Sequence, residues 1–233
     1  MPIFKNKEEY KQWIDEQEWY QTIDLPSGLK TPGKVPTHLR EPLFNQIDFK
    51  GKTFLDVGCN SGQYCFLAKE RGAREVVGID ISTKRIEQAR ILAENEGYDV
   101  KFEERSIFDT NSLGRFDIVF CVAVLTEIQD IFGAIEQLKQ LIGKCGFIEL
   151  DLAKPIAYAS YSKRWLKGHP TLSRRTAVAE VRQIKGGKWV VSPSFDVLQA
   201  VFDEEFKLTR KKGGIRYDLV EVVRVIIRTR KDI

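Results

Sequence analysis

Short apolar runs alternate with amphipathic stretches along residues 53–152 of the chain. The apolar runs have strand-like patterning and predict five strands, at residues 53–57, 75–81, 100–104, 116–125 and 146–152. Apolar positions at helical spacing predict three helices between them, at residues 62–71, 82–97 and 129–142. This repeated alternation predicts an α/β fold with an open, mostly parallel sheet and helices on both faces.

The N-terminal part of the chain does not follow this alternation. Asn6 and Glu9 have the spacing of a capping box, which predicts a helix as far as about Trp19. Prolines and glycines predict a shaped loop over residues 20–36, and a second short helix is expected at residues 37–47.

The C-terminal part is irregular and basic before it becomes regular again. A helix and two strands are predicted in it, at residues 195–205, 206–209 and 217–229. The two strands are expected to form an antiparallel hairpin, which brings the sheet to seven strands. We therefore expect N-terminal helices and a lid loop at residues 1–49, and a main domain at 50–233 with a basic insertion at 153–191.

Length and composition exclude several classes of protein. The 233 residues suit one domain with an appendage, and the longest apolar run, Ile118 to Leu125, is far shorter than the roughly 20 residues of a membrane span. The charged start has no apolar stretch behind it, so we expect no signal peptide and a cytoplasmic location. Scattered cysteines without a CxxC pair predict buried reduced thiols, at Cys59, Cys65, Cys121 and Cys145.

The mild net charge of +4 is unevenly distributed. Between Ser160 and Val190 there are eight Lys and Arg residues against a single acid, Glu180. Aromatic residues lie among or beside these bases, at Tyr158, Tyr161, Trp165 and Trp189. This combination is typical of single-stranded RNA binding, but it also suits an acidic or phosphorylated saccharide, and a solvated basic face remains an open alternative.

A glycine-rich turn follows the first predicted strand. Asp56, Gly58 and Gly62 belong to the sequence Asp-Val-Gly-Cys-Asn-Ser-Gly, and Asp80 ends the next predicted strand. The glycines allow the backbone to turn sharply beside a ligand, and a carboxylate in the place of Asp80 can accept hydrogen bonds from a ribose diol. The sequence predicts a nucleotide-like ligand, and the acid at position 56 favours a cationic amine over a pyrophosphate.

Residues 50–152 resemble class I S-adenosylmethionine (SAM) methyltransferases, whose fold is Rossmann-like and doubly wound. The resemblance implies that the turn surrounds the methionine part of SAM and that the strand-end acid holds the ribose. It also implies contacts to the adenine, although this chain has Ser106 where the family usually has an acid, and Asp109 has the wrong offset for that role. The implied cofactor-binding residues are Tyr20, Asp56, Gly58, Asn60, Gly62, Asp80, Ile81, Ser106, Ile107 and Val122.

The segment from Trp19 to Gly33 resembles the leader of tRNA 5-methoxyuridine-type methyltransferases, which act on the wobble uridine. Enzymes of that group that use carboxy-SAM carry Tyr-His-Arg after the fourth strand, whereas this chain has Thr126-Glu127-Ile128. The arginine for an extra carboxylate is missing. We therefore expect ordinary SAM, S-adenosylhomocysteine (SAH) as its product, and transfer of a plain methyl group.

An oxygen acceptor benefits from a general base beside the site of transfer. Glu127 and Asp151 follow the fourth and fifth strands, and His169 lies in the basic insertion, so these are the candidate catalytic residues. A solvated or ion-paired role is an equal alternative for each acid. An acidic cluster at the same place also suits a divalent metal, which the sequence does not favour.

The favoured function is SAM-dependent O-methylation of a hydroxyl group on a saccharide or another small metabolite. The first alternative is a tRNA wobble-uridine methyltransferase, since the leader supports it and the missing Tyr-His-Arg opposes it. The second alternative is a non-catalytic SAM-fold module that binds a partner. The intact glycine turn and Asp80 oppose this last reading. The sequence leaves the oligomeric state open.

Overall fold

The computed structural model describes residues 3–35, 44–45, 47–151, 179–183, 189–193, 206–211 and 222–228. The chain forms two compact units. The first contains Met1–Phe120 and Gln140–Gly143, and the second contains Cys121–Lys139 and Lys144–Ile233.

The sheet of the first unit carries the alternation that the sequence predicts. Its strands are β1 (Thr53–Val57), β2 (Glu75–Asp80), β3 (Lys101–Glu104) and β4 (Phe116–Cys121, of which Cys121 belongs to the second unit). They follow the order β3-β2-β1-β4, and the β1–β2 and β2–β3 pairs are parallel. The direction of winding therefore reverses between β1 and β4, and ligands of such sheets bind at the carboxyl ends of the strands near this reversal.

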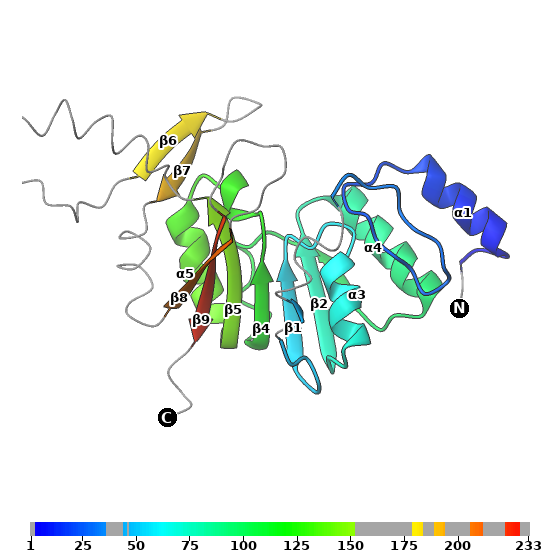
Figure 1. Ribbon diagram of the computed structural model, residues 1–233, viewed down its shortest axis with the longest axis horizontal. Coiled ribbons are helices and arrows are strands. Elements are labelled where there is room, and N and C mark those ends of the chain that lie inside the picture. The colour runs from blue at the N-terminus through cyan, green and yellow to red at the C-terminus, as the bar shows by residue number, and fades with distance from the viewer. Residues whose placement is uncertain are drawn as a thin grey trace, which may run out of the picture. The chain divides into compact units, whose positions relative to one another are not determined.

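Two helices connect the parallel strands and lie against them (Figure 1). They are α3 (Gln63–Glu70) after β1 and α4 (Thr83–Glu96) after β2. Right-handed crossovers that proceed in one direction place both helices on the same face of the sheet. The Ser82 side chain caps α4 by accepting from the Arg85 N–H, and Gly97 ends it in the left-handed conformation, as the sequence predicts.

The N-terminal helix α1 (Lys7–Glu16) ends one turn before the predicted position. Asn6 caps it through the Glu9 N–H, but the Glu9 carboxylate accepts from the Lys5 N–H instead of closing the box on Asn6. The chain leaves the helix at Gln17 so that the indole N–H of Trp19 can donate to the Ile14 carbonyl over 2.7 Å. This buried bond explains why the helix does not continue to Trp19.

The leader that follows is a loop that folds back on itself. Its two arms meet in a parallel bridge between Gln21 and Val35, and in an antiparallel bridge between Asp24 and Lys30. The buried Thr31 hydroxyl joins the arms, since it donates to the Gln21 carbonyl and accepts from the Ile23 N–H, each over 2.8 Å. The shaped loop predicted from prolines and glycines is therefore held by its own backbone.

Within its described residues, the second unit contains one short helix, most of a longer one and five strands. These elements are η2 (Leu125–Glu127), α5 (Ile131–Leu141), β5 (Ile142–Asp151), β6 (Ala179–Gln183), β7 (Trp189–Pro193), β8 (Phe206–Lys211) and β9 (Val222–Arg228). The end of α5 and the start of β5 (Gln140–Gly143) belong to the first unit. β9 pairs antiparallel with both β5 and β8, and β6 pairs antiparallel with β7. The expectation that residues 153–191 are irregular is wrong for β6 and the start of β7, whose apolar positions are too few to stand out in a basic stretch.

The mostly parallel α/β sheet is confirmed, while the count of seven strands, the C-terminal hairpin and the division at residue 50 stay predictions. The helix predicted at 195–205 lies outside the described residues, and so does most of the one at 37–47. In the part of the chain that the structure describes, no helix is long and apolar enough to span a membrane.

Candidate functional site

The glycine-rich turn between β1 and α3 crosses the end of β2. The N–H groups of Gly58 and Cys59 both donate to the Ile79 carbonyl, over 2.8 and 3.0 Å. Three of its residues have positive φ: Gly58 at 76°, Asn60 at 52° and Gly62 at 91°. The turn is thus held in a left-handed path that exposes backbone rather than side chains.

Asn60 is the unusual member because it is not glycine. Its side-chain Oδ1 accepts from the Ser61 N–H over 2.9 Å and from the Ser61 hydroxyl over 3.2 Å. Asparagine tolerates the left-handed region since its short amide can bond locally in this way. The conformation is therefore fixed by the turn itself.

Gly62 must be a glycine for a second reason. A Cβ atom there would lie 2.6 Å from the Phe102 ring, closer than real contacts allow. Gly62 also precedes α3 and provides no side-chain cap for it. Next to it, the amide Nε2 of Gln63, a residue only 1% exposed, has no hydrogen-bond partner within the described residues.

Asp80 occupies the carboxyl end of β2, beside the turn. Its Oδ2 accepts from the Asn60 N–H and its Oδ1 from the Ser82 N–H, each over 2.9 Å. A carboxylate offers about four lone-pair positions, so two acceptor positions remain for a ligand. The two backbone bonds fix the direction of the carboxylate before any ligand arrives.

The residues after β2 and β3 form the other border of the site. Ile81 is 76% exposed although it is a large aliphatic residue, and it directly follows Asp80. The Arg105 N–H donates to the Asp80 carbonyl over 2.9 Å, which places Ser106 and the buried Ile107 in the neighbouring loop. The exposed Ile81 side chain lies between the Asp80 carboxylate and the backbone of the loop after β3. In this position it can pack against one face of a flat heterocycle.

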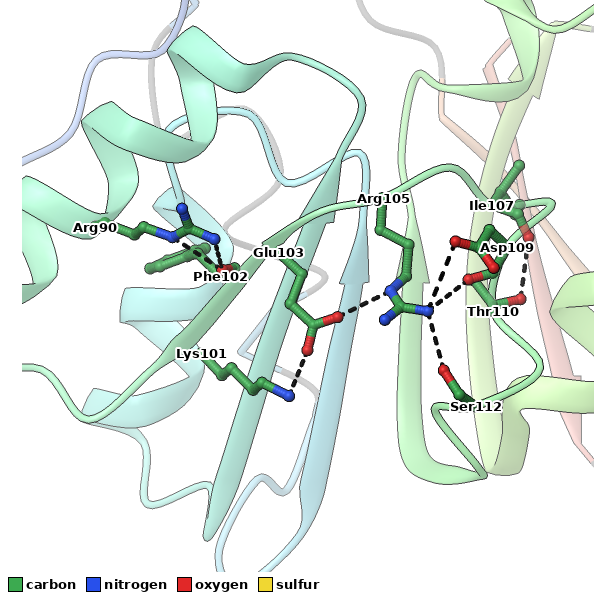
Figure 2. Close-up of polar contacts among 9 residues, drawn as sticks. All are labelled: Arg90, Lys101, Phe102, Glu103, Arg105, Ile107, Asp109, Thr110 and Ser112. Atoms are coloured by element: carbon green, nitrogen blue, oxygen red, sulfur yellow. Dashed lines mark hydrogen bonds and ion pairs between the residues drawn. The ribbon is translucent and has the colours of Figure 1, made fainter.

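The loop after β3 is held from behind by Arg105, as Figure 2 shows. The guanidinium Nε donates to Glu103 over 2.8 Å, and NH1 donates to the Asp109 carbonyl over 2.7 Å and to the Ser112 hydroxyl over 3.0 Å. Lys101 pairs with the other oxygen of Glu103. Asp109 thus contributes its carbonyl to this anchor, while its carboxylate lies 4.0 Å from Arg105 and is exposed.

Asp56 is buried near the end of β1, and its environment contains two thiols. The Cys65 thiol lies 3.9 Å from Oδ2 of Asp56. Burial raises the pKa of Cys65 well above its ordinary value, and burial also raises the pKa of Cys59. Both stay protonated and unreactive, in agreement with the buried free thiols expected from the sequence.

Gln88 of α4 connects Glu18, directly before the leader, with Ser61 in the glycine-rich turn. The sequence did not indicate this residue as part of the site. The amide Nε2 donates to the Glu18 carbonyl over 3.1 Å, and Oε1 accepts from the Ser61 hydroxyl over 3.1 Å. Arg85 donates to the same Glu18 carbonyl over 2.7 Å. Two residues further, Tyr20 is half-exposed. The only sign in the sequence was a glutamine within a predicted helix, and its partners, Glu18 and Ser61, are distant along the chain.

The remaining candidates belong to the second unit or lie outside the described residues. Val122 is half-buried and Glu127 is exposed on η2, which packs against β7. Asp151 ends β5, and His169 lies outside the described residues. The structure thus brings the cofactor candidates of the first unit together, whereas the catalytic assignments stay predictions. Within the described residues, no group of three or more metal-ligating side chains is present.

A family model described as a methyltransferase domain matches residues 48–166. The tRNA U34 carboxymethyltransferase of Campylobacter lari is 32% identical over 118 residues, 50% of this chain and 40% of that protein. The ubiquinone biosynthesis O-methyltransferase of Coxiella burnetii is 33% identical over 140 residues, 57% of this chain and 59% of that protein. The chain therefore spans less than two thirds of either relative.

A solved structure resembles the chain over nearly its full length. The N-terminal domain of EvdMO1, crystallised in the presence of SAH and D-fucose, has a TM-score of 0.69 at 14% identity. The likeness covers 97% of this chain and 98% of that domain. At this identity it establishes the fold.

Proposed function

We propose that this chain, which belongs to the methyltransferase domain family, is a SAM-dependent enzyme of class I that methylates a hydroxyl group of a saccharide or another small metabolite. Bound SAM supplies the methyl group on a sulfonium, which makes the leaving group neutral. What the chain itself must supply is a fixed cofactor, a positioned acceptor and a place for the acceptor's proton. We further propose that the sheet has seven strands and includes a C-terminal antiparallel hairpin.

The residues of the first unit fit the cofactor. The preset Asp80 carboxylate has acceptor positions left for the ribose diol, and the exposed Ile81 offers an apolar surface to the adenine. The unpartnered Gln63 amide offers a donor to a carboxylate, and it lies at the N-terminus of α3, where the helix dipole favours a negative charge. An orphaned buried amide costs free energy unless a ligand completes it, which makes Gln63 a further cofactor candidate.

The single observation that carries the saccharide proposal is the full-length likeness to the EvdMO1 domain. That domain was crystallised with a deoxysugar, and its likeness extends beyond the methyltransferase core to 97% of this chain. We propose that the exposed Glu127 accepts the proton of the acceptor hydroxyl. Asp151 and His169 remain further candidates for acceptor contact.

A tRNA wobble uridine is the second candidate acceptor. The identity to the Campylobacter lari enzyme and the Trp19–Gly33 leader favour it. Against it, this chain has Thr126-Glu127-Ile128 where the resembling enzymes that use carboxy-SAM carry Tyr-His-Arg. The two candidates differ in the size and charge of the acceptor, so one experiment can separate them.

Calorimetry should first establish that the chain binds SAM and SAH. Transfer of tritium from labelled SAM should then be measured with free and nucleotide-linked deoxysugars, with quinols, and with unmodified tRNA. We expect label in a sugar and none in tRNA. Label in tRNA alone would replace the proposal by its alternative, and SAH binding without any transfer would favour a non-catalytic module. Repeating the assay with a chelator tests the metal, which we expect to be dispensable.

A further inference from the structure

The loop after β3 borders the proposed adenine site, and two of its backbone donors are unused within the described residues. Within the described residues we find no hydrogen-bond partner for the N–H groups of Ser106 and Ile107, although the loop is otherwise rich in internal bonds. The Ser106 hydroxyl accepts from the Phe108 N–H over 3.2 Å, and the Ser106 carbonyl accepts from the Asp109 N–H over 3.0 Å. These bonds turn the loop and leave its first two amides outside the turn.

The bonds of the turn are short in sequence and cannot fix the loop against the sheet. Arg105 does so at three places, and Figure 2 shows its guanidinium between β3 and the loop. It bonds to Glu103 on the strand, and to the Asp109 carbonyl and the Ser112 hydroxyl on the far side of the loop. Its own N–H donates to the carbonyl of Asp80, the proposed ribose ligand. Arg105 thus sets the distance between the loop and Asp80, whose carboxylate is the proposed ribose ligand.

This arrangement replaces the acid that the family usually has after the third strand. The Ser106 hydroxyl can both donate and accept a hydrogen bond. It therefore discriminates only weakly between the amino group of adenine and the carbonyl group of a deaminated base. A backbone N–H is a donor alone. It bonds to N1 of adenine, which is an acceptor, and it opposes the N1–H of a deaminated base.

We propose that Arg105 is a positioning residue for base recognition, which holds the loop so that the backbone donors of Ser106 and Ile107 read the adenine edge of the cofactor. This inference rests on the proposed function, because it requires that the site binds SAM or SAH. It assigns adenine selectivity to a side chain that does not touch the base.

The test compares SAH with S-inosylhomocysteine, its deaminated analogue, by calorimetry. The wild type should bind SAH more tightly. Arg105→Ala should weaken SAH binding roughly fivefold and leave the analogue almost unchanged, so that the preference disappears. Arg105→Lys keeps the charge without the planar fork and should lose part of the preference. Lys101→Ala removes the other cation on Glu103 with the same change of charge, and should keep the preference.

A second measurement does not depend on the cofactor. The amides of Phe108 and Asp109 are the hydrogen-bonded ones of the turn, and in the free chain their hydrogen exchange should become several times faster in Arg105→Ala and stay unchanged in Lys101→Ala. If Arg105→Ala is poorly folded, Ser112→Ala removes one exposed anchor bond and should give the same changes at smaller size.

The outcomes separate this inference from the proposed function. A wild type that binds neither compound overturns both. A wild type that binds SAH but does not prefer it over the analogue overturns the proposal that the backbone donors of Ser106 and Ile107 recognise the adenine. A preference that survives in every Arg105 variant overturns the role of Arg105 and leaves the cofactor site in place.

Discussion

The hydroxyl of Ser61 donates to Oε1 of Gln88 over 3.1 Å, which ties the glycine-rich turn to α4. The amide of the same glutamine donates to the carbonyl of Glu18, the residue directly before the leader. Ser61 and Gln88 are both buried, so water does not compete for these bonds. A single side chain therefore connects the glycine-rich turn with the segment that leads into Tyr20.

Gln88→Leu should lower the free energy of unfolding by about 1–3 kcal/mol, because it removes one of the two hydrogen bonds of the buried Ser61 hydroxyl and one of those of the Glu18 carbonyl. It should also weaken SAH binding, since Ser61 belongs to the turn. Urea unfolding and calorimetry measure the two effects. Gln12→Leu is the matched control, because Gln12 is exposed on α1 and bonds only to Glu16 among the described residues. Equal stability of the two variants would contradict the role of Gln88.

The sequence predicted the strands and helices of the first unit well because each has a local cause. Apolar runs mark β1 and β2, and the caps of α4 are a serine and a glycine in their preferred places. The glycine-rich turn and Asp80 lie together for a similar reason, since adjacent strand ends meet at one edge of the sheet, while their role toward a cofactor stays a prediction.

What the sequence did not predict depends on partners that are distant along the chain. Gln88 is one polar residue in a helix until Glu18 and Ser61, 70 and 27 positions away, are placed against it. The end of α1 was misplaced because the bond from Trp19 to Ile14 competes with the helix. The strands β6 and β7 were missed because pairing between them, rather than a strong local pattern, defines them.

Asp80→Asn should weaken SAH binding by about tenfold or more, since hydrogen bonds to a charged group contribute roughly 1.5–3 kcal/mol. The amide also cannot accept from both the Asn60 and Ser82 N–H groups, so the turn loses one of its supports. Calorimetry of the variant measures the loss. Asp99→Asn, which changes an exposed partner of Lys69, should leave the affinity unchanged. An Asp80 variant with wild-type affinity would remove the carboxylate from the cofactor site.

Gly33→Ala should loosen the leader, because a Cβ atom there would lie 2.1 Å from the Gln21 carbonyl group. Overpacking of this kind costs roughly 1–3 kcal/mol. Limited proteolysis should then cut the leader faster than in the wild type. Gly97→Ala is the comparison, since nothing lies within 4 Å of its Cβ and only its φ of +75° is strained. If proteolysis of the leader is unaffected by Gly33→Ala, the two arms are not held together as described.

Glu103 should make stability depend on pH in the acid range. Hydrogen bonding to Lys101, and then to Arg105, lowers the pKa of its carboxyl below the ordinary value of 4.5. A lowered pKa in the folded state means that the carboxylate stabilises the fold fully above the unfolded pKa. This contribution shrinks as the pH falls below about 4.5, where the unfolded chain takes up the proton first, and it is lost below the folded pKa.

Urea unfolding of the wild type and Glu103→Gln at a series of pH values measures this contribution. The wild type should be the more stable above about pH 5, and the difference should vanish as the pH falls through the folded pKa of Glu103. Glu104→Gln, on the opposite face of β3, gives the baseline for loss of an exposed acid. Lys101→Met should reduce the pH-dependent part, because Lys101 makes the largest contribution to the lowered pKa. A difference between wild type and Glu103→Gln that is the same at every pH would show that the ion pair does not favour the charged carboxylate.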